Sequence, residues 1–302
     1  MLTGEDVIPV PAPGEPPFVT RFAPSPTGLL HLGHAYSALF AHETAKACGG
    51  RFLLRIEDID HTRCRAEFEK ATVDDLRWLG LRWEAPAWRQ SPRADVYLGA
   101  LGKLEDLAVV YPCFCTRAEI RHEIAESARA PHAPSGEPVY PGTCRHLDPK
   151  EAEARIARGM PHAWRLDVEA AIAHTGPLAW YDVRAGWQDC RAIEFGDVVL
   201  ARKDIPTSYH LAVTVDDAAQ GVTLVTRGED LFHATHVHRL LQALLGLPTP
   251  TYYHHNLIAT ADGQRLAKRN RSVSLKYFRE RGHTPAAIWA QLGLGRPTTV
   301  AG

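Results

Sequence analysis

The stretch FVTRFAPSPTGLLHLGH at residues 18–34 decides the fold. Its apolar start, residues 18–20, predicts a short strand that ends near Arg21. Two prolines and a glycine within residues 24–28 then require an irregular loop, and a helix is expected over residues 35–47. In an open parallel sheet, such a strand end and helix start form the edge at which ligands bind. The free N–H groups at the start of the helix suit a phosphate.

Two histidines stand at this helix start. His31 and His34 are three residues apart, so their imidazoles lie on one face of the first turn. Gly33 between them removes a side chain where a flat ring or a ribose could pack against the backbone. A structural interpretation, in which the histidines cap the helix at the surface, remains open at this point.

The whole segment RFAPSPTGLLHLGH resembles the HIGH signature of class I aminoacyl-tRNA synthetases, in the form found in the glutamyl and glutaminyl branch. The resemblance implies an α/β fold with a Rossmann-type parallel sheet and an inserted, zinc-bearing α+β subdomain. It implies that His31, Gly33 and His34 bind ATP, the two histidines being catalytic. It also implies a glutamate pocket to which Arg21, Ala23 and Ser25 contribute.

A second apolar strand, residues 51–56, ends in the acidic run Glu57-Asp58-Ile59-Asp60. Carboxylates at this strand end face the same crevice as the loop that follows the first strand. An acidic turn at the surface is the alternative. The family has an RxEDxD motif here, and the resemblance implies that Glu57 contacts the α-amino group of the substrate.

Two further residues are expected to complete the glutamate pocket. Tyr209 matches the tyrosine of the family's YxLAxxVDD run, although core packing is an alternative for it. Arg227 follows an apolar strand at residues 221–226, where a guanidinium can grip a carboxylate with two hydrogen bonds. With Arg21 it offers two forks for a substrate with two carboxylates, which would select glutamate over glutamine. A surface ion pair is the alternative for each arginine.

A metal site is predicted from a cysteine pair and a distant third cysteine. Cys113 and Cys115 can reach one ion from an extended strand, and Cys144 comes from a later turn. Three thiolates suit Zn²⁺, which needs a fourth ligand. In the family a tyrosine four residues before the last cysteine supplies it, and Tyr140 has that spacing. Two histidines, His132 and His146, remain alternatives for the fourth place, and three buried free thiols are the alternative to any metal.

The run QRLAKR at residues 264–269 resembles the mobile KMSKS loop of the family, which brings cations to the phosphates of ATP. It departs from that pattern, because Arg265 replaces the first lysine and Ala267 the serine. Lys268 is the retained lysine, and it would place a positive charge where negative charge develops in the transition state. Taken alone, a basic run is usually solvated surface.

Composition and length limit which partners and which cellular compartment are expected. The 302 residues carry a formal net charge of −1, which argues against a general electrostatic coating of nucleic acid but permits a local basic patch. We find neither a signal peptide nor an apolar run of the roughly 20 residues that a membrane span requires, so a cytoplasmic protein is expected. Cysteines in that compartment are not expected to form disulfides.

The expected division of the chain has four parts. Residues 1–17 form a mobile N-terminal extension, 18–110 the first half of the catalytic domain, and 111–195 the inserted subdomain with the zinc site. That insertion includes strands at 163–168 and 178–183. Residues 196–302 form the second half of the catalytic domain with the KMSKS-like loop and two short tail helices, near 274–281 and 285–292.

The shortness of the chain after the KMSKS-like loop resembles that of short paralogues of glutamyl-tRNA synthetase, which carry no anticodon-binding region. The resemblance implies activation of L-glutamate by ATP with Mg²⁺, without tRNA. Transfer to the queuosine in the anticodon loop of tRNA(Asp) would follow. An enzyme that charges the 3′ end of tRNA with the help of a separate partner, and a non-catalytic paralogue that binds glutamate or RNA, are the alternatives.

Overall fold

The computed structural model describes residues 6–126, 139–202, 205–258 and 273–294. The first half of the fold alternates strands and helices in the order β1 (Val19–Phe22), α1 (Leu32–Ala47), β2 (Arg51–Ile56), α2 (Ala66–Trp78) and β3 (Trp88–Arg89). The three strands are parallel and adjacent in the order β1-β2-β3. β2 is buried along nearly its whole length, as expected for an apolar strand covered on both faces.

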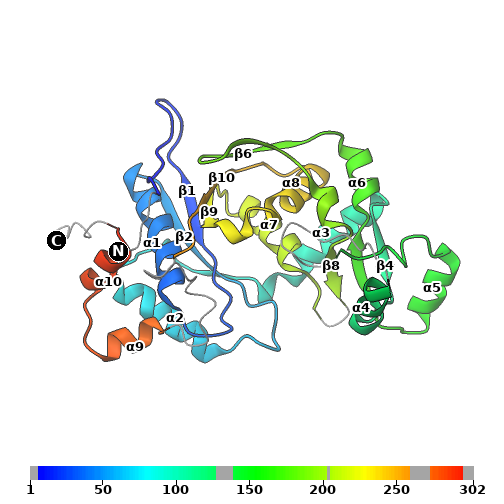
Figure 1. Cartoon of the computed structure of the whole chain (residues 1–302), viewed down its shortest axis with the longest axis horizontal. Coiled ribbons are helices and arrows are strands. Elements are labelled where there is room, and N and C mark those ends of the chain that lie inside the picture. Colours follow the sequence, from blue (N-terminus) through cyan, green and yellow to red (C-terminus); the bar gives the residue numbers. More distant parts are fainter. Residues whose placement is uncertain (1–5, 127–138, 203–204, 259–272, 295–302) are drawn as a thin grey trace.

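A second parallel pair continues this arrangement beyond β1. It consists of β9 (Leu224–Gly228) and β10 (Thr251–His255), connected by α8 (Ala234–Leu244). β9 lies beside β1, because the amide of Thr223 donates to the carbonyl of Val19 at 3.0 Å (Figure 1). The strand order therefore reverses between β1 and β9, with β2 on one side and β10 on the other. Such a switch point opens a crevice at the carboxyl ends of the strands.

A separate antiparallel sheet lies between the two halves in sequence. It has the order β4 (Val110–Cys113), β5 (Ala163–Leu166), β8 (Val199–Arg202), and it is accompanied by α4 (Arg117–Glu126), α5 (Pro149–Ala157) and α6 (Val168–Thr175). In Figure 1, α4 and α5 lie at one end of the long axis, and α9 (Leu275–Glu280) and α10 (Pro285–Gln291) lie at the other. The two short tail helices predicted from the sequence are therefore present.

The hairpin of β6 (Ala179–Asp182) and β7 (Gly186–Asp189) joins the sheet of β9 and β10. Asp182 of β6 is the register partner of Tyr252 in β10. The expectation that the strand at 178–183 belongs to the insertion is therefore wrong about its sheet, although it is right about the strand. The residue pattern of a short strand specifies which face is buried but not which strand it pairs with.

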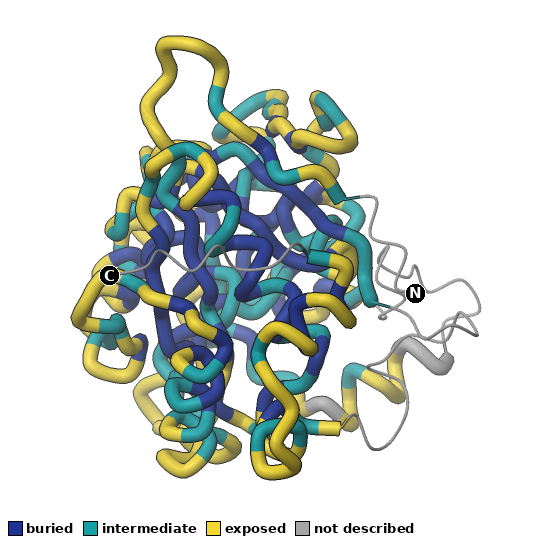
Figure 2. The backbone as a smooth tube through the Cα atoms, turned by 90° about the vertical axis from the view of Figure 1, so that its left-hand side faces the viewer, coloured by how far each residue is buried: buried dark blue, intermediate teal, exposed yellow. Residues whose placement is uncertain are grey.

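The helices around the crevice share buried apolar faces. α3 (Ala94–Asp106) and α7 (Tyr209–Ala219) pack into one core with α8, and α1 and α2 form another with the tail helices. Figure 2 shows that the buried residues gather in the interior of the fold and the exposed ones at its rim. α3 ends at Asp106, and Ala108 just beyond it adopts φ 54°, which a right-handed helix cannot continue. Short 3₁₀ turns complete the elements: η1 (Ser91–Arg93), η2 (Ala192–Phe195) and η3 (Glu229–Leu231). Within the described ranges, every helix is too short or too polar to cross a bilayer.

The segment before β1 contacts the fold through Asp6. Its carboxylate accepts hydrogen bonds from the hydroxyl of Tyr36 at 2.7 Å and from the amide of Asn256 at 3.1 Å, and it pairs with Arg184 at 3.2 Å. The expectation of a mobile N-terminal extension therefore does not hold at Asp6. The three donors lie on α1, just after β10 and in the turn between β6 and β7, a set of tertiary contacts that proline-rich composition does not reveal.

Candidate active site

The predicted ligand-binding residues converge on one cavity at the carboxyl ends of the parallel strands. The cavity has a volume of about 580 Å³. Nine of the predicted residues line it: Arg21, Ala23, Ser25, His31, Gly33, His34, Glu57, Tyr209 and Arg227. They come from separate segments of the chain that only the parallel topology brings together. Lys268, with the rest of 264–269, lies outside the described residues.

The two histidines at the start of α1 cap the helix and line the cavity at the same time. Nδ1 of His31 accepts from the backbone N–H of Gly33 at 3.1 Å, and Nδ1 of His34 accepts from the N–H of His31 at 3.2 Å. The rings stack with centroids 3.8 Å apart. Burial lowers the pKa of His31, and burial next to His31 lowers the pKa of His34 to about 4. Because Nδ1 is the acceptor, each neutral ring carries its proton on Nε2, where it can donate to a ligand.

Gly33 makes room for this cap. A Cβ at this position would lie 3.0 Å from Cε1 and 3.1 Å from Nδ1 of His31. The His31 ring therefore occupies the space beside Gly33. The sequence interpretation assigns that space to a flat ring or a ribose of a ligand. Capping and ligand binding are not alternatives here, since the cap fixes the tautomer that can serve a phosphate.

Arg21 is buried, and its guanidinium is already paired with a carboxylate. Its Nε donates to Oδ1 of Asp217 at 3.0 Å, its Nη2 donates to Oδ2 at 3.4 Å, and its Nη1 donates to the carbonyl of Thr226 at 3.1 Å. Arg55 also donates to Asp217, at 2.8 Å. The picture of two equivalent forks for two substrate carboxylates is therefore wrong for this structure. Arg21 ties β1 to α7 and β9, and Asp217 offsets its charge.

Arg227 is equally buried but has a different set of partners. Its Nε donates to Nε2 of His254 at 3.0 Å, and its Nη2 donates to Oγ1 of Thr235 at 2.6 Å. Its Nη1 donates to Nδ1 of His238 at 3.2 Å and to the hydroxyl of Tyr209 at 3.3 Å. All four acceptors are neutral, and none of the described Asp or Glu side chains pairs with this guanidinium. Arg227 therefore has no direct ion-pair partner among the described residues, and the carboxylate of Asp182 reaches it only through the ring of His254.

Glu57 is an acidic residue that lines the same cavity. It directly follows β2, is 6 % exposed and accepts from Nη2 of Arg55 at 3.2 Å. Burial raises the pKa of its carboxyl, and the charges of Arg55 and Arg21 oppose that rise. A ligand ammonium group beside Glu57 would favour the ionised form of its carboxyl. The cavity thus presents a cation and an anion at separate places, as a zwitterionic amino acid with a charged side chain requires.

A second cavity opens from the same walls. It has a volume of about 500 Å³ and shares Ser25, Glu57 and Tyr209 with the first cavity. Its far wall includes Tyr140 and Arg165 of the antiparallel sheet region. A group entering through the second cavity would therefore reach the amino-acid end of the first.

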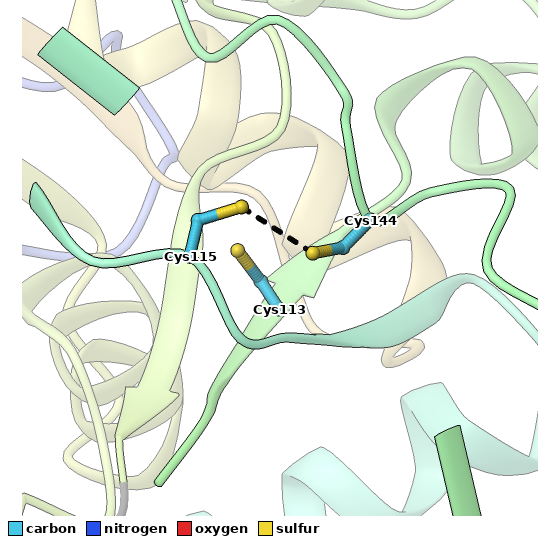
Figure 3. Close-up of side chains that lie close together, drawn as sticks. All are labelled: Cys113, Cys115 and Cys144. Atoms are coloured by element: carbon cyan, nitrogen blue, oxygen red, sulfur yellow. Dashed lines mark hydrogen bonds between the residues drawn. The ribbon is translucent and has the colours of Figure 1, made fainter. Parts of the chain in front are cut away.

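Three cysteines gather beyond this second cavity, as predicted (Figure 3). The Sγ atoms of Cys113, Cys115 and Cys144 lie within 4.8 Å of one another, and those of Cys115 and Cys144 are 3.4 Å apart. The hydroxyl of Tyr140 lies 3.3 Å from Sγ of Cys113 and 3.5 Å from Sγ of Cys115. Four donors at these spacings fit a tetrahedral ion with Zn–S distances of about 2.3 Å. His146 is exposed and not part of the cluster, and His132 lies outside the described residues.

The sequence reasoning missed the groups that surround the two arginines. Asp217 lies within the VDD run that was noted for its resemblance, but no pattern indicates that it pairs with Arg21. His254 is the second-last residue of β10, and its position near the strand end is the one signal that could have pointed to it. His238 and Thr235 face Arg227 from α8, where a histidine or threonine at a helix surface carries no such signal.

Comparison with known proteins assigns this fold to one class. The family model described as "tRNA synthetases class I (E and Q), catalytic domain" matches residues 17–299. A solved glutamate tRNA ligase from Elizabethkingia meningosepticum, in complex with its amino acid, superposes with a TM-score of 0.75 at 26 % identity. That match covers 92 % of this chain and 60 % of the ligase chain. The predicted α/β fold with its parallel sheet is thereby confirmed.

The relatives of similar length narrow the class. The glutamyl-Q tRNA(Asp) synthetase of Rhodobacter capsulatus is 50 % identical over 283 residues, which cover 91 % of this chain and all of that protein. The one of Symbiobacterium thermophilum is 42 % identical, with 90 % of this chain and 84 % of that protein covered. The glutamate–tRNA ligase of Aquifex aeolicus is 40 % identical, but this chain spans only 56 % of it. The chain belongs to the glutamyl-Q tRNA(Asp) synthetase family.

Proposed function

We propose that this protein activates L-glutamate with ATP and transfers it to queuosine in tRNA(Asp). The observation that carries the first half is the cavity at the switch point. There a guanidinium without a direct ion-pair partner among the described residues, a buried carboxylate and two neutral imidazoles face one volume. The second half rests on the relatives that bear this activity in their name and share the length of the chain.

In the first step, the α-carboxylate oxygen of glutamate attacks the α-phosphorus of ATP. A bond forms between them, the bond to the bridging oxygen of pyrophosphate breaks, and glutamyl-AMP results. Glu57 would hold the α-ammonium and Arg227 the side-chain carboxylate, while Ala23 and Ser25 line the space between. The Nε2–H groups of His31 and His34 would donate to phosphate oxygens as their charge grows. Lys268 would add a cation there, and Mg²⁺ would accompany ATP.

In the second step, a hydroxyl of the queuosine ring attacks the carbonyl carbon of the mixed anhydride. The new ester bond forms, AMP leaves, and the hydroxyl proton passes to a phosphate oxygen of the departing AMP. The second cavity offers this nucleoside a path, since it reaches Ser25, Glu57 and Tyr209 from the side opposite the histidines. Arg165 on its wall could meet a phosphate of the anticodon loop.

Two assays test the two halves of this function separately. Glutamate-dependent ATP–pyrophosphate exchange is expected without any RNA, and its absence at millimolar glutamate would refute the activation step. Labelled glutamate is then expected to attach to tRNA(Asp) that contains queuosine at least 100-fold faster than to the same tRNA without it, because the nucleophile is missing. Equal labelling of both tRNAs would remove the queuosine assignment while leaving activation intact.

We also propose that Cys113, Cys115, Tyr140 and Cys144 hold one structural Zn²⁺. The three sulfurs and the phenol oxygen converge, and Tyr140 already accepts the amide N–H of Cys144 at 2.9 Å. The guanidinium of Arg165 lies 3.8 Å from the centre of the Tyr140 ring. Burial and the hydrogen bonds with the thiols of Cys113 and Cys115 raise the pKa of Tyr140, so the metal itself would have to stabilise the phenolate. The ion would join the end of β4 to a later turn, remote from the histidines of the first cavity.

Replacing Cys144 by serine is expected to reduce bound zinc from about one equivalent to less than about 0.1, because structural zinc sites need all four ligands. Metal analysis of protein purified without chelators measures this directly. Cys48→Ser is the matched control, because Cys48 lies at the end of α1 and its thiol bonds only to backbone groups there. Wild-type protein that contains no zinc would contradict the proposal, and so would a Cys144→Ser protein that retains it.

A further inference from the structure

Three buried arginines on or next to β1, β2 and β9 are satisfied in two different ways. Arg21 and Arg55, 5 % and 0 % exposed, both donate to the carboxylate of Asp217. Arg227 is also 5 % exposed, yet each of its partners is uncharged. A carboxylate would satisfy a buried guanidinium more strongly than an imidazole does. The neutral acceptors around Arg227 therefore leave its guanidinium less strongly satisfied than those of Arg21 and Arg55.

The hydrogen bonds fix the state of the two imidazoles that contact Arg227. Because arginine only donates, Nε2 of His254 and Nδ1 of His238 must be acceptors. The proton of His254 is then on Nδ1, which donates to Oδ2 of Asp182 at 2.7 Å. The proton of His238 is on Nε2, which donates to Nδ1 of His210 at 3.1 Å. Each ring is held in one tautomer by a partner on its far side.

Both rings are also held uncharged. Burial together with the charge of Arg227 lowers the pKa of His254 to about 4, and the same two causes lower the pKa of His238 well below its ordinary value. Asp182 opposes the shift of His254, but it is itself occupied by the amides of Arg184 and Ala185 at 2.9 Å each. Arg227 is thus surrounded by acceptors that orient it without offsetting its charge.

We propose that His238 and His254 are positioning residues that satisfy the hydrogen bonds of Arg227 without neutralising it, so that the guanidinium keeps its full attraction for the side-chain carboxylate of glutamate. The inference rests on the proposed function and deepens it by naming the residues that set the preference for glutamate over glutamine. In a low-dielectric site, a charge without a direct ion-pair partner attracts a ligand carboxylate far more strongly than a charge that is already paired. A fixed carboxylate at either histidine would compete with the substrate.

The test compares His238→Asp with His238→Asn. In the asparagine variant, the amide oxygen can take the place of Nδ1 and remain neutral, so the KM for glutamate in ATP–pyrophosphate exchange is expected to stay within about 3-fold. In the aspartate variant, the new carboxylate pairs with Arg227. The KM for glutamate is then expected to rise about 100-fold, with kcat at saturation changed less than about 5-fold. The value of kcat/KM with glutamine is expected to change little, so the ratio of kcat/KM for glutamate to that for glutamine falls.

The separation of KM from kcat is the readout that a purely structural role would not move, and thermal unfolding shows whether each variant is folded. His238→Asp is expected to unfold at the same or a higher temperature than wild type, because it completes a buried ion pair. If that variant does not fold, Thr235→Asp against Thr235→Asn puts the same question at the acceptor 2.6 Å from Nη2. A folded aspartate variant with wild-type KM would overturn the inference, and so would equal losses in the aspartate and asparagine variants. Wild-type protein without exchange activity would instead refute the proposed function itself.

Discussion

Replacing Arg227 by methionine is expected to raise the KM for L-glutamate about 1000-fold in ATP–pyrophosphate exchange, because the side-chain carboxylate loses its buried partner. Methionine fills a similar volume without a charge. The four neutral groups around Arg227 cannot take over its role, since none of them is a cation. Calorimetric titration with glutamate in the absence of ATP measures the same loss as a binding constant. The KM for glutamine is expected to change little, so the preference for glutamate over glutamine nearly disappears.

Arg239→Met is the matched control for this experiment. Arg239 lies on α8, one turn beyond Thr235, and donates to the carbonyl of Ala179 at the protein surface. Its loss is expected to leave the KM for glutamate within about 2-fold, as is usual for a surface substitution. A folded Arg227→Met variant with unchanged KM would show that another group holds the side-chain carboxylate. The first candidate would then be Arg21, after release from Asp217.

The position of the site could be predicted from the sequence because its residues mark the ends of parallel strands. Arg21, Glu57 and Arg227 each stand at or beside the carboxyl end of β1, β2 or β9, and parallel strands align these ends on one edge. His31 and His34 follow from the same logic, since α1 begins at that edge. Chain order and strand direction were sufficient to bring these residues together.

The partners of these residues could not be predicted in the same way. Whether Arg21 faces a substrate or Asp217 depends on how closely α7 approaches β1, and no local pattern encodes that distance. The pairing of β6 with β10 was missed for a similar reason, because the sequence of a short strand does not specify which strand it pairs with. Asp6 shows the same limit, since its contacts lie roughly 30 and 250 residues away. Long-range polar pairing is therefore where the structure adds most to the sequence.

Substituting His34 by asparagine is expected to lower kcat of ATP–pyrophosphate exchange about 100- to 1000-fold, while the KM for glutamate changes little. The amide oxygen of asparagine can still accept from the N–H of His31, so the cap of α1 is kept. Asparagine has nothing in the place of Nε2–H, so the change removes only the donor proposed for the phosphates. His42→Asn, on the same helix but bonded to Glu43, is the control. A folded His34→Asn variant with normal kcat would contradict this role.

The pH dependence of stability tests whether the His34 ring is neutral in the folded protein, as its proposed role as a donor to phosphate requires. The pKa of His34 is about 4 in the folded protein, below its ordinary value of 6.5, because the ring is buried beside His31. The folded state therefore binds fewer protons than the unfolded chain between these pH values. The contribution of the neutral His34 ring to the free energy of unfolding is complete above about pH 6.5 and is lost as the pH falls towards 4. His34→Asn cannot titrate, so its free energy of unfolding is expected to fall less steeply than that of wild type over this range. If both proteins lose stability in parallel, the buried neutral imidazole inferred here is wrong, and with it the Nε2–H donor assigned to the phosphate.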